Sequence, residues 1–342
     1  MSALVPAGPF RALVRLHART LWVVLAAACV SAGALVWAAL HEINTRPADP
    51  ARHGHLFDEA YLPGPDTYAS IVVYNAPGAL LLLPVLVAAY AAGPLSAREF
   101  ESGTASLLRT QSVSPTRWFT SKLVLATAVV AAGVLLLTAT YRWAWTAHLI
   151  QPYERQWFTS TVFPSVGPAL AAYCLLGLAL GLLVGGVLRR TLPAVGLTLA
   201  ALGLVMIVLH RFRGALWPVT TTTSGTPRFL SVRAPDHTFA VDRGVILQDG
   251  SRAGIPRCGN ASGDALTACL DKAGVVDWYA DYHPASHFWP LQLVETGILL
   301  LLAALAAGAS YALVRRRTAP RPLAAAPAPN APAHPAREEA AV

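Results

Sequence analysis

Six long apolar runs alternate with polar connections along the chain. The runs cover residues 20–40, 71–91, 123–144, 167–188, 192–209 and 291–314. A bilayer core of about 30 Å takes about 20 helical residues, and every backbone group in it must bond within its own segment. The pattern therefore predicts an all-α integral membrane protein with six transmembrane helices. Pro77 and Pro84 predict a kink in the second helix.

The polar connections differ in length and divide the chain into regions. We expect a cytoplasmic N-terminus at 1–19, helices 1–5 within 20–209 with a cytoplasmic coupling loop at 94–122, an extracytoplasmic lobe at 210–290, the sixth helix at 291–314 and a disordered cytoplasmic tail at 315–342. The tail is rich in proline and alanine, which cannot build a core. The sequence does not predict the internal structure of the lobe.

The N-terminal region places charge and apolar side chains on different helical faces. Arg11, Arg15 and Arg19 recur every four residues, and Phe10 and Leu13 fall on another face. This pattern predicts an N-terminal interfacial helix. The alternative is a positively charged flank without a helix. The first apolar run is longer than the roughly 7–15 residues of a signal-peptide core, so we expect an uncleaved first span.

Composition and charge agree with a membrane protein. Hydrophobic residues make up 55% of the chain and charged residues 13%, well below the roughly 25% charge of soluble domains. The four segments assigned to the cytoplasm carry fourteen Lys and Arg against four Asp and Glu. This asymmetry places both termini in the cytoplasm of a multi-pass protein of the cell membrane. The same distribution accounts for the net charge of +8, because the basic residues lie where they can meet an anionic membrane surface. We therefore expect membrane lipid, and not nucleic acid, as a partner.

Two cysteines lie in the lobe and two in the spans. Cys258 and Cys269 belong to the lobe, whereas Cys29 and Cys174 fall inside predicted helices. An extracytoplasmic location favours a disulfide between the first two. It would stabilise the lobe by about 3 kcal/mol on the chain-entropy model. Two free thiols are the alternative.

The chain has no sequence for hydrolysing a nucleotide. A P-loop needs Gly-Lys-Ser or Gly-Lys-Thr, but Lys122 follows Ser121 and Lys272 follows Asp271. Ion-driven carriers place charges near the bilayer midplane, and here the span interiors are almost free of them. We therefore expect no enzyme and no cofactor, and a separate subunit that supplies energy.

Chemistry-bearing residues are few where the chain enters the last span. Trp289, Gln292 and Glu295 are candidates for lining an exit pathway, and the alternative for Glu295 is a carboxylate that only bonds near the interface. Histidines gather in two places, His53 with His55 and Asp281 with His283 and His287. Neither group supplies a full metal-ligand set, so we expect no metal site. The second group lies in an aromatic-rich stretch typical of a membrane interface.

Three glycines recur every four residues in the fourth span. Gly177, Gly181 and Gly185 form a smooth stripe on one helical face, where another helix can approach closely. The stripe predicts helix packing, within the subunit or at a dimer contact. The alternative is that these glycines have no packing role, because glycine is common in membrane helices.

The loop between spans two and three carries helix-start signals. Ser96 with Glu99 predicts a capping box, and Ser114 before Pro115 predicts a second helix start. The loop is thus expected to form helix, turn and helix. A rigid element of this kind can receive force from a motor subunit, with Glu101 placed to meet a basic residue of the motor. The alternative is an amphipathic connector.

The same loop resembles the permease subunits of type-2 ABC exporters, particularly actinobacterial ones. The similar residues are Arg98–Thr104, then Thr110–Val113, and Arg117 with Trp118. A second resemblance covers Tyr282–Trp289, where His287 stands in place of an arginine found in relatives. The coupling residues that the resemblance implies are Arg98, Glu99, Glu101, Gly103, Thr104 and Gln111.

The resemblance also implies partners: a cytoplasmic ABC ATPase subunit and a second permease subunit, either a second copy or a paralogue. The leading hypothesis is a permease that exports an amphipathic or hydrophobic substrate. The rival is a non-transporting membrane sensor or assembly scaffold whose outer lobe binds a ligand. An adjacent gene for an ATPase would favour the permease.

Overall fold

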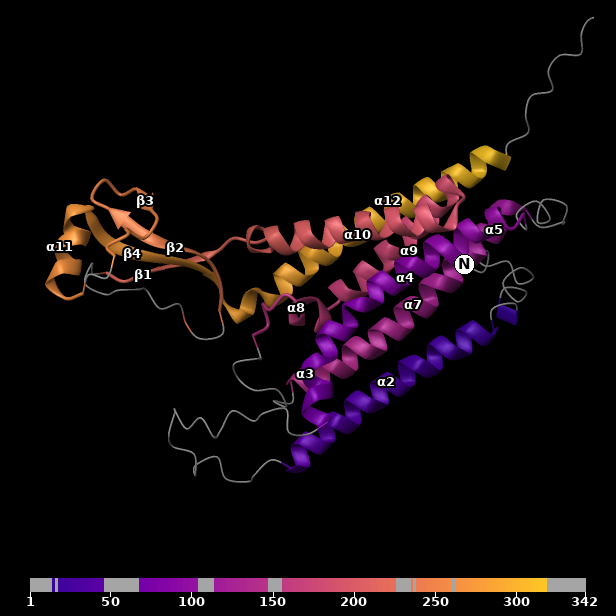
Figure 1. Cartoon of the computed structure of the whole chain (residues 1–342), viewed down its shortest axis with the longest axis horizontal. Helices are drawn as coiled ribbons and strands as arrows, with labels where there is room; N and C mark the ends of the chain where they lie inside the picture. Colours follow the sequence, from indigo (N-terminus) through magenta and orange to yellow (C-terminus); the bar gives the residue numbers. More distant parts are fainter. Residues whose placement is uncertain are drawn as a thin grey trace, which may run out of the picture.

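The structure is a computed structural model that describes residues 18–45, 68–103, 114–146, 156–225, 238–259 and 262–318, with residues 14, 15 and 235. Its membrane helices are α2 (Ala18–Thr45), α3 (Tyr68–Leu80), α4 (Leu82–Ala92), α7 (Pro115–Thr146), α9 (Ala169–Leu188), α10 (Thr191–Phe212) and α12 (Phe288–Thr318). Shorter helices are η3 (Gly93–Ala97), α5 (Arg98–Glu101), α8 (Val162–Ser165), η4 (Arg213–Ala215) and η5 (Ala285–His287). The helices form an elongated bundle with a β lobe at one end (Figure 1).

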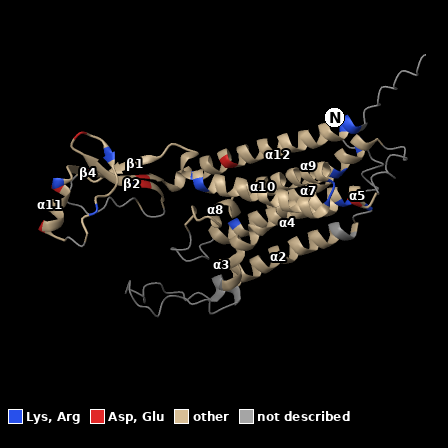
Figure 2. Cartoon of the chain, turned by 45° about the horizontal axis from the view of Figure 1, so that its top comes forward, with Lys and Arg blue, Asp and Glu red and all other residues tan. Residues whose placement is uncertain are grey.

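Within the described residues, six helices are long and apolar enough to cross a membrane, which confirms the expected six spans. They run over Trp22–His41, Ile71–Glu101, Pro115–Thr146, Ala169–Leu188, Thr191–Ala215 and Ala285–Arg317, with mean hydropathy from 2.1 to 2.5. Charged residues lie toward the ends of the bundle and in the lobe, and the middle of the helices is almost free of them (Figure 2). The N-terminal interfacial helix and the tail beyond residue 318 lie outside the described residues.

The second span is longer than expected and is built in pieces. It breaks at Leu81, between α3 and α4, and Pro84 lacks the N–H that would bond back across this break. It then continues through the π-helix η3 into α5 and ends at Glu101. The predicted helix start at Ser96 is therefore wrong. Ser96 lies inside a continuous helical segment, and its hydroxyl donates to the carbonyl of Leu182, 3.3 Å away.

Helix α9 is the centre of the bundle. It packs against α4, α7, α10 and α12, and it is the most deeply buried of the six spans. Its own side chains are almost all apolar. A continuous core therefore forms around α9, whereas α2 packs mainly on α3 and α7 at the edge of the bundle.

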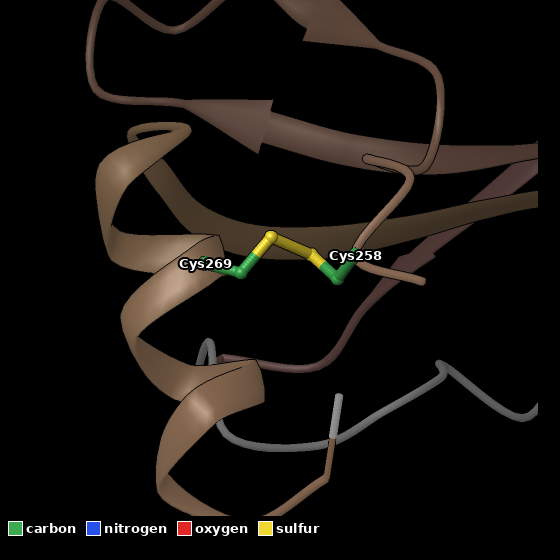
Figure 3. The surroundings of a disulfide bond; sticks show 2 residues. All are labelled: Cys258 and Cys269. Carbon is green, nitrogen blue, oxygen red and sulfur yellow. A yellow bond between two sulfur atoms is a disulfide. The ribbon is translucent and has the colours of Figure 1, made fainter. Parts of the chain in front are cut away.

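The part of the lobe that the structure describes is a four-stranded antiparallel sheet with one helix. Its strands are β1 (Thr220–Thr223), β2 (Phe239–Leu247), β3 (Arg252–Ala253) and β4 (Val275–His283), in the order β1-β4-β2-β3. Helix α11 (Asp264–Lys272) packs on β4. The membrane part is all-helical as expected, and the lobe adds the sheet. The predicted disulfide is present: Cys258, in the segment after β3, bonds to Cys269 of α11 (Figure 3).

Candidate functional site

The candidate coupling segment is α5, at the end of the bundle opposite the lobe, which we call the α5 end (Figure 1). Its Glu99 carboxylate pairs with the ammonium of Lys122 on α7, with 2.5 Å between Oε1 and Nζ. Lys122 also donates to the carbonyl of Leu95, 3.0 Å away. Because burying an unpaired ammonium costs several kcal/mol, these two acceptors explain how a buried lysine is tolerated in α7. Glu99 thus binds a second helix instead of capping its own.

A second set of contacts joins α5 to the turn between α9 and α10. The Glu101 carboxylate accepts from the backbone N–H of Thr191 at 3.3 Å and from its hydroxyl. Thr191 is the first residue of α10, so Glu101 caps that helix from another segment and carries negative charge to its N-terminus. The guanidinium of Arg189 lies 5.4 Å from the Phe100 ring centroid. Segment α5 is therefore tied to α7, α9 and α10.

The other predicted coupling residues are placed only in part. Arg98 and Gly103 are exposed, and Gly103 ends the segment with a positive φ of 74°. Ser114 accepts from the N–H of Arg117 at 3.4 Å, at the start of α7 as the sequence indicated. Thr104 and Gln111 lie outside the described residues.

The glycine stripe of α9 faces α4 and η3 within the same chain. A Cβ added at Gly181 would lie 2.6 Å from that of Ala91 and 2.7 Å from the N atom of Ala92. Added at Gly185, it would lie 2.6 Å from the carbonyl of Ala92. Added at Gly177, it would lie 2.9 Å from the carbonyl oxygen of Pro84. The stripe thus allows α4 and α9 to pack backbone against backbone.

At the lobe end, Glu295 of α12 belongs to a buried polar cluster. Its carboxylate accepts from Arg213 Nε at 3.0 Å and Nη2 at 3.3 Å, and from the Tyr173 hydroxyl at 2.8 Å. Glu295 is 0% exposed and Arg213 3%. The Arg213 guanidinium also lies 4.0 Å from the ring centroid of Phe163. Arg213 follows α10 directly, and Tyr173 projects from α9, so three spans meet at one carboxylate.

Gln292 joins the same part of α12 to the start of α9. Its side-chain oxygen accepts from the N–H of Ala169 at 3.3 Å, and its amide nitrogen donates to the Phe163 carbonyl. It rests on Gly167, where an added Cβ would come within 2.4 Å of the amide. Trp289 is instead 48% exposed, and its ring centroid lies 4.8 Å from the Cζ atom of Arg142. The structure therefore brings Gln292 and Glu295 together and separates Trp289 from them.

The sequence did not single out Arg213 or Tyr173 as partners of Glu295. A signal for Arg213 was present, because it lies only four residues beyond the expected end of the fifth span. Both Gln292 and Glu295 are fully buried and bonded. The bonds of Glu295 agree with the alternative stated above, a carboxylate that only bonds near the interface, and the exit pathway stays a prediction.

A histidine pair links the lobe to the bundle. His283, the last residue of β4, lies 2.9 Å from the Gly214 carbonyl and 3.0 Å from His287 Nδ1. Since a carbonyl only accepts, His283 Nε2 carries a proton and His287 donates to His283 Nδ1. Burial lowers the pKa of His283, and the Gly214 carbonyl opposes that shift. Burial thus favours a neutral imidazole at His283, where the lobe joins the bundle.

Hydropathy, helix number and bundle geometry define a multi-pass membrane protein with a small disulfide-bonded lobe. The family described as ABC-2 membrane transporter related matches residues 20–213, more than half of the chain. The chain belongs to this family. Comparison with curated proteins gives no match.

Proposed function

We propose that the chain is the permease subunit of an ABC exporter, driven by ATP hydrolysis on a separate cytoplasmic subunit. It would form, with a second permease subunit, the pathway for an amphipathic or hydrophobic substrate. The family supports a membrane transporter permease. The charge-poor spans support the substrate class, because a charged cargo would need partners in the membrane.

The observation that carries the proposal is the attachment of α5 to several spans. Helix α5 continues α4 without a break, and its Glu99 holds Lys122 on α7. Glu101 holds the start of α10. A push on α5 therefore reaches α4, α7 and α10 through bonds rather than through a flexible loop. A force-receiving element needs this stiffness.

The proposal is tested on Glu101 in reconstituted vesicles that contain the chain and its ATPase. Glu101→Ala removes both the charge and the cap, whereas Glu101→Gln removes the charge and keeps an oxygen acceptor for Thr191. We expect both variants to lose transport and the response of ATPase activity to substrate. Asp271→Ala, which removes an exposed acid of the lobe, is the matched control and should behave as wild type.

Three results would speak against this role of Glu101. Wild-type transport by both variants would make α5 only a connector. Loss in Glu101→Ala alone, with Glu101→Gln active, would limit Glu101 to capping α10. Failure of the chain to copurify with any ATPase would favour the sensor or scaffold hypothesis.

A further inference from the structure

A furrow inside the membrane part is separate from the Glu295 cluster and touches the coupling contacts only at Lys122 and Leu95. It lies between α2, α4 and α7 and has a volume of about 530 Å³. Ligand pockets commonly measure about 300–1,000 Å³. Its α7 wall runs from Lys122 to Leu137, which at 1.5 Å per residue is about 22 Å. The furrow is therefore long and narrow and runs along the helices.

The lining excludes water as a stable occupant. Polar side chains reach the furrow only from Ser31, Tyr90 and Lys122, and the rest of the wall is apolar. A buried water needs two to four polar partners, which most of this wall does not offer. The three helices also have mean hydropathy of 2.1 to 2.3, so hydrocarbon surrounds them at this depth. An apolar chain therefore suits this wall better than water does.

The furrow has a charged end and an apolar end. Lys122 lines it at the α5 end, where Nζ donates to Leu95 and to Glu99. An ammonium has three N–H donors, so two bonds leave one for a further acceptor. Arg98 and Arg117 are exposed at the same end of the bundle. This polarity matches an amphiphile with an apolar tail and an anionic head.

A helix from a second copy fits the furrow less well. Helices α2 and α7 meet behind it, where a Cβ added at Gly133 would contact that of Ala28 at 3.9 Å. The furrow is therefore bounded by this chain's own helices. An entering helix has a diameter of about 10 Å and would have to displace α2.

We propose that the furrow binds one acyl chain of an acidic phospholipid of the bilayer, with the headgroup at the Lys122 end. One leaflet contributes about 15 Å of hydrocarbon, so a single extended chain can follow most of the α7 wall from the Lys122 end toward Leu137. The phosphate then accepts from Lys122 and lies near the exposed arginines. Binding of this lipid does not require transport or the ATPase.

The test is photo-crosslinking of the full chain in lipid nanodiscs. The probe is phosphatidylglycerol with a diazirine on one acyl chain, and phosphatidylcholine with the same chains is the neutral comparison. Mass spectrometry locates the label. We expect phosphatidylglycerol to label the α4 and α7 peptides about fivefold more than phosphatidylcholine, because one charge-assisted bond to Lys122 distinguishes the two lipids.

Filling the furrow should remove the label. Gly133→Leu and Ala126→Phe each place bulk in it and should reduce labelling of α7 about tenfold, on the scale of losing one or two buried methylene groups. Gly203→Leu and Ala200→Phe make the same changes on α10, away from the furrow, and should leave labelling unchanged. Circular dichroism and size-exclusion chromatography establish that all four variants are folded.

Charge is tested apart from shape. The double variant Lys122→Met with Glu99→Gln removes both charges together and should abolish the preference for phosphatidylglycerol while phosphatidylcholine labels as before. Labelling that survives both filling variants, or that shows no lipid preference in wild type, would overturn the proposal. So would disulfide-linked dimers of Val24→Cys together with an unlabelled furrow, because a second copy would then occupy it. No ATPase takes part, so these outcomes are independent of the transport assay.

Discussion

The two ends of the bundle each hold an ion pair, but the two pairs lie in different surroundings. Arg213 and Glu295 are almost completely buried, and Tyr173 provides a further bond. Lys122 is similarly buried, yet the side chain of its partner Glu99 is 29% exposed. The lobe-end pair is thus enclosed by three spans. In the α5-end pair, Glu99 reaches solvent and Lys122 lines the furrow between α2, α4 and α7.

The burial of its partners, rather than the presence of opposite charges, decides what an ion pair can do. An enclosed pair is strongly penalised when one partner is lost, because the other charge stays in a low-dielectric site. A pair with one exposed partner can separate at lower cost, since water replaces the lost bond. The lobe end is therefore suited to holding the spans together, and the α5 end to responding to a partner.

The largest effect is expected from breaking the enclosed pair. Arg213→Ala leaves the Glu295 carboxylate buried without its cation and should lower the free energy of unfolding by about 3–5 kcal/mol. Thermal unfolding in detergent measures this. Arg211→Ala, which removes an exposed arginine two residues away, is the control. If both variants unfold at the same temperature, the comparison between the two ends fails.

Loss of the disulfide should reduce stability about as much as Arg213→Ala does, but only within the lobe. Cys269→Ser reopens the link between α11 and the segment after β3 and should destabilise the lobe by about 3 kcal/mol. Hydrogen exchange of the β2 and β4 peptides measures it, and the α9 peptides should not change. Cys29→Ser, in an exposed position of α2, is the control. Four alkylatable thiols in the unreduced wild type would show that the bond is absent.

A smaller effect is expected at the α5 end. Glu99→Gln weakens the bond to Lys122 and leaves the Leu95 carbonyl as an acceptor. The free energy of unfolding should fall by about 1–2 kcal/mol, because the variant loses a hydrogen bond to a charged group whose partner is partly exposed. The same thermal assay applies. A loss as large as that of Arg213→Ala would show that the two pairs are equivalent.

The smallest effect concerns pH at the lobe end. The pKa of His283 is lowered by burial, and the unfolded value is about 6.5. Below about pH 6.5 the unfolded chain therefore binds a proton that the folded His283 does not. As the pH is lowered through this window, the free energy of unfolding should decrease, and it should level off below the folded pKa. His283→Gln should reduce this slope, whereas His210→Gln, at an exposed position, should keep it.

Local features of the sequence were enough to predict the spans, the disulfide and the absence of a P-loop. Span length and apolar content follow from the bilayer itself, so they can be read without knowing any contact. Cys258 and Cys269 were the only cysteines in the lobe, which left one pairing within it. The start of α7 at Ser114 also depends on adjacent residues.

Which polar groups meet depends on packing between segments that are far apart in the chain. Arg213 and Glu295 are 82 residues apart, and Glu101 and Thr191 are 90 apart, so no local pattern joins them. Ser96 had the sequence of a cap, but α9 packs close enough to accept its hydroxyl bond, and the helix continues through it. The structure of the lobe depends in the same way on strand pairing across a long segment. Local chemistry determined where helices lie in the membrane, whereas packing determined how their few charges are neutralised.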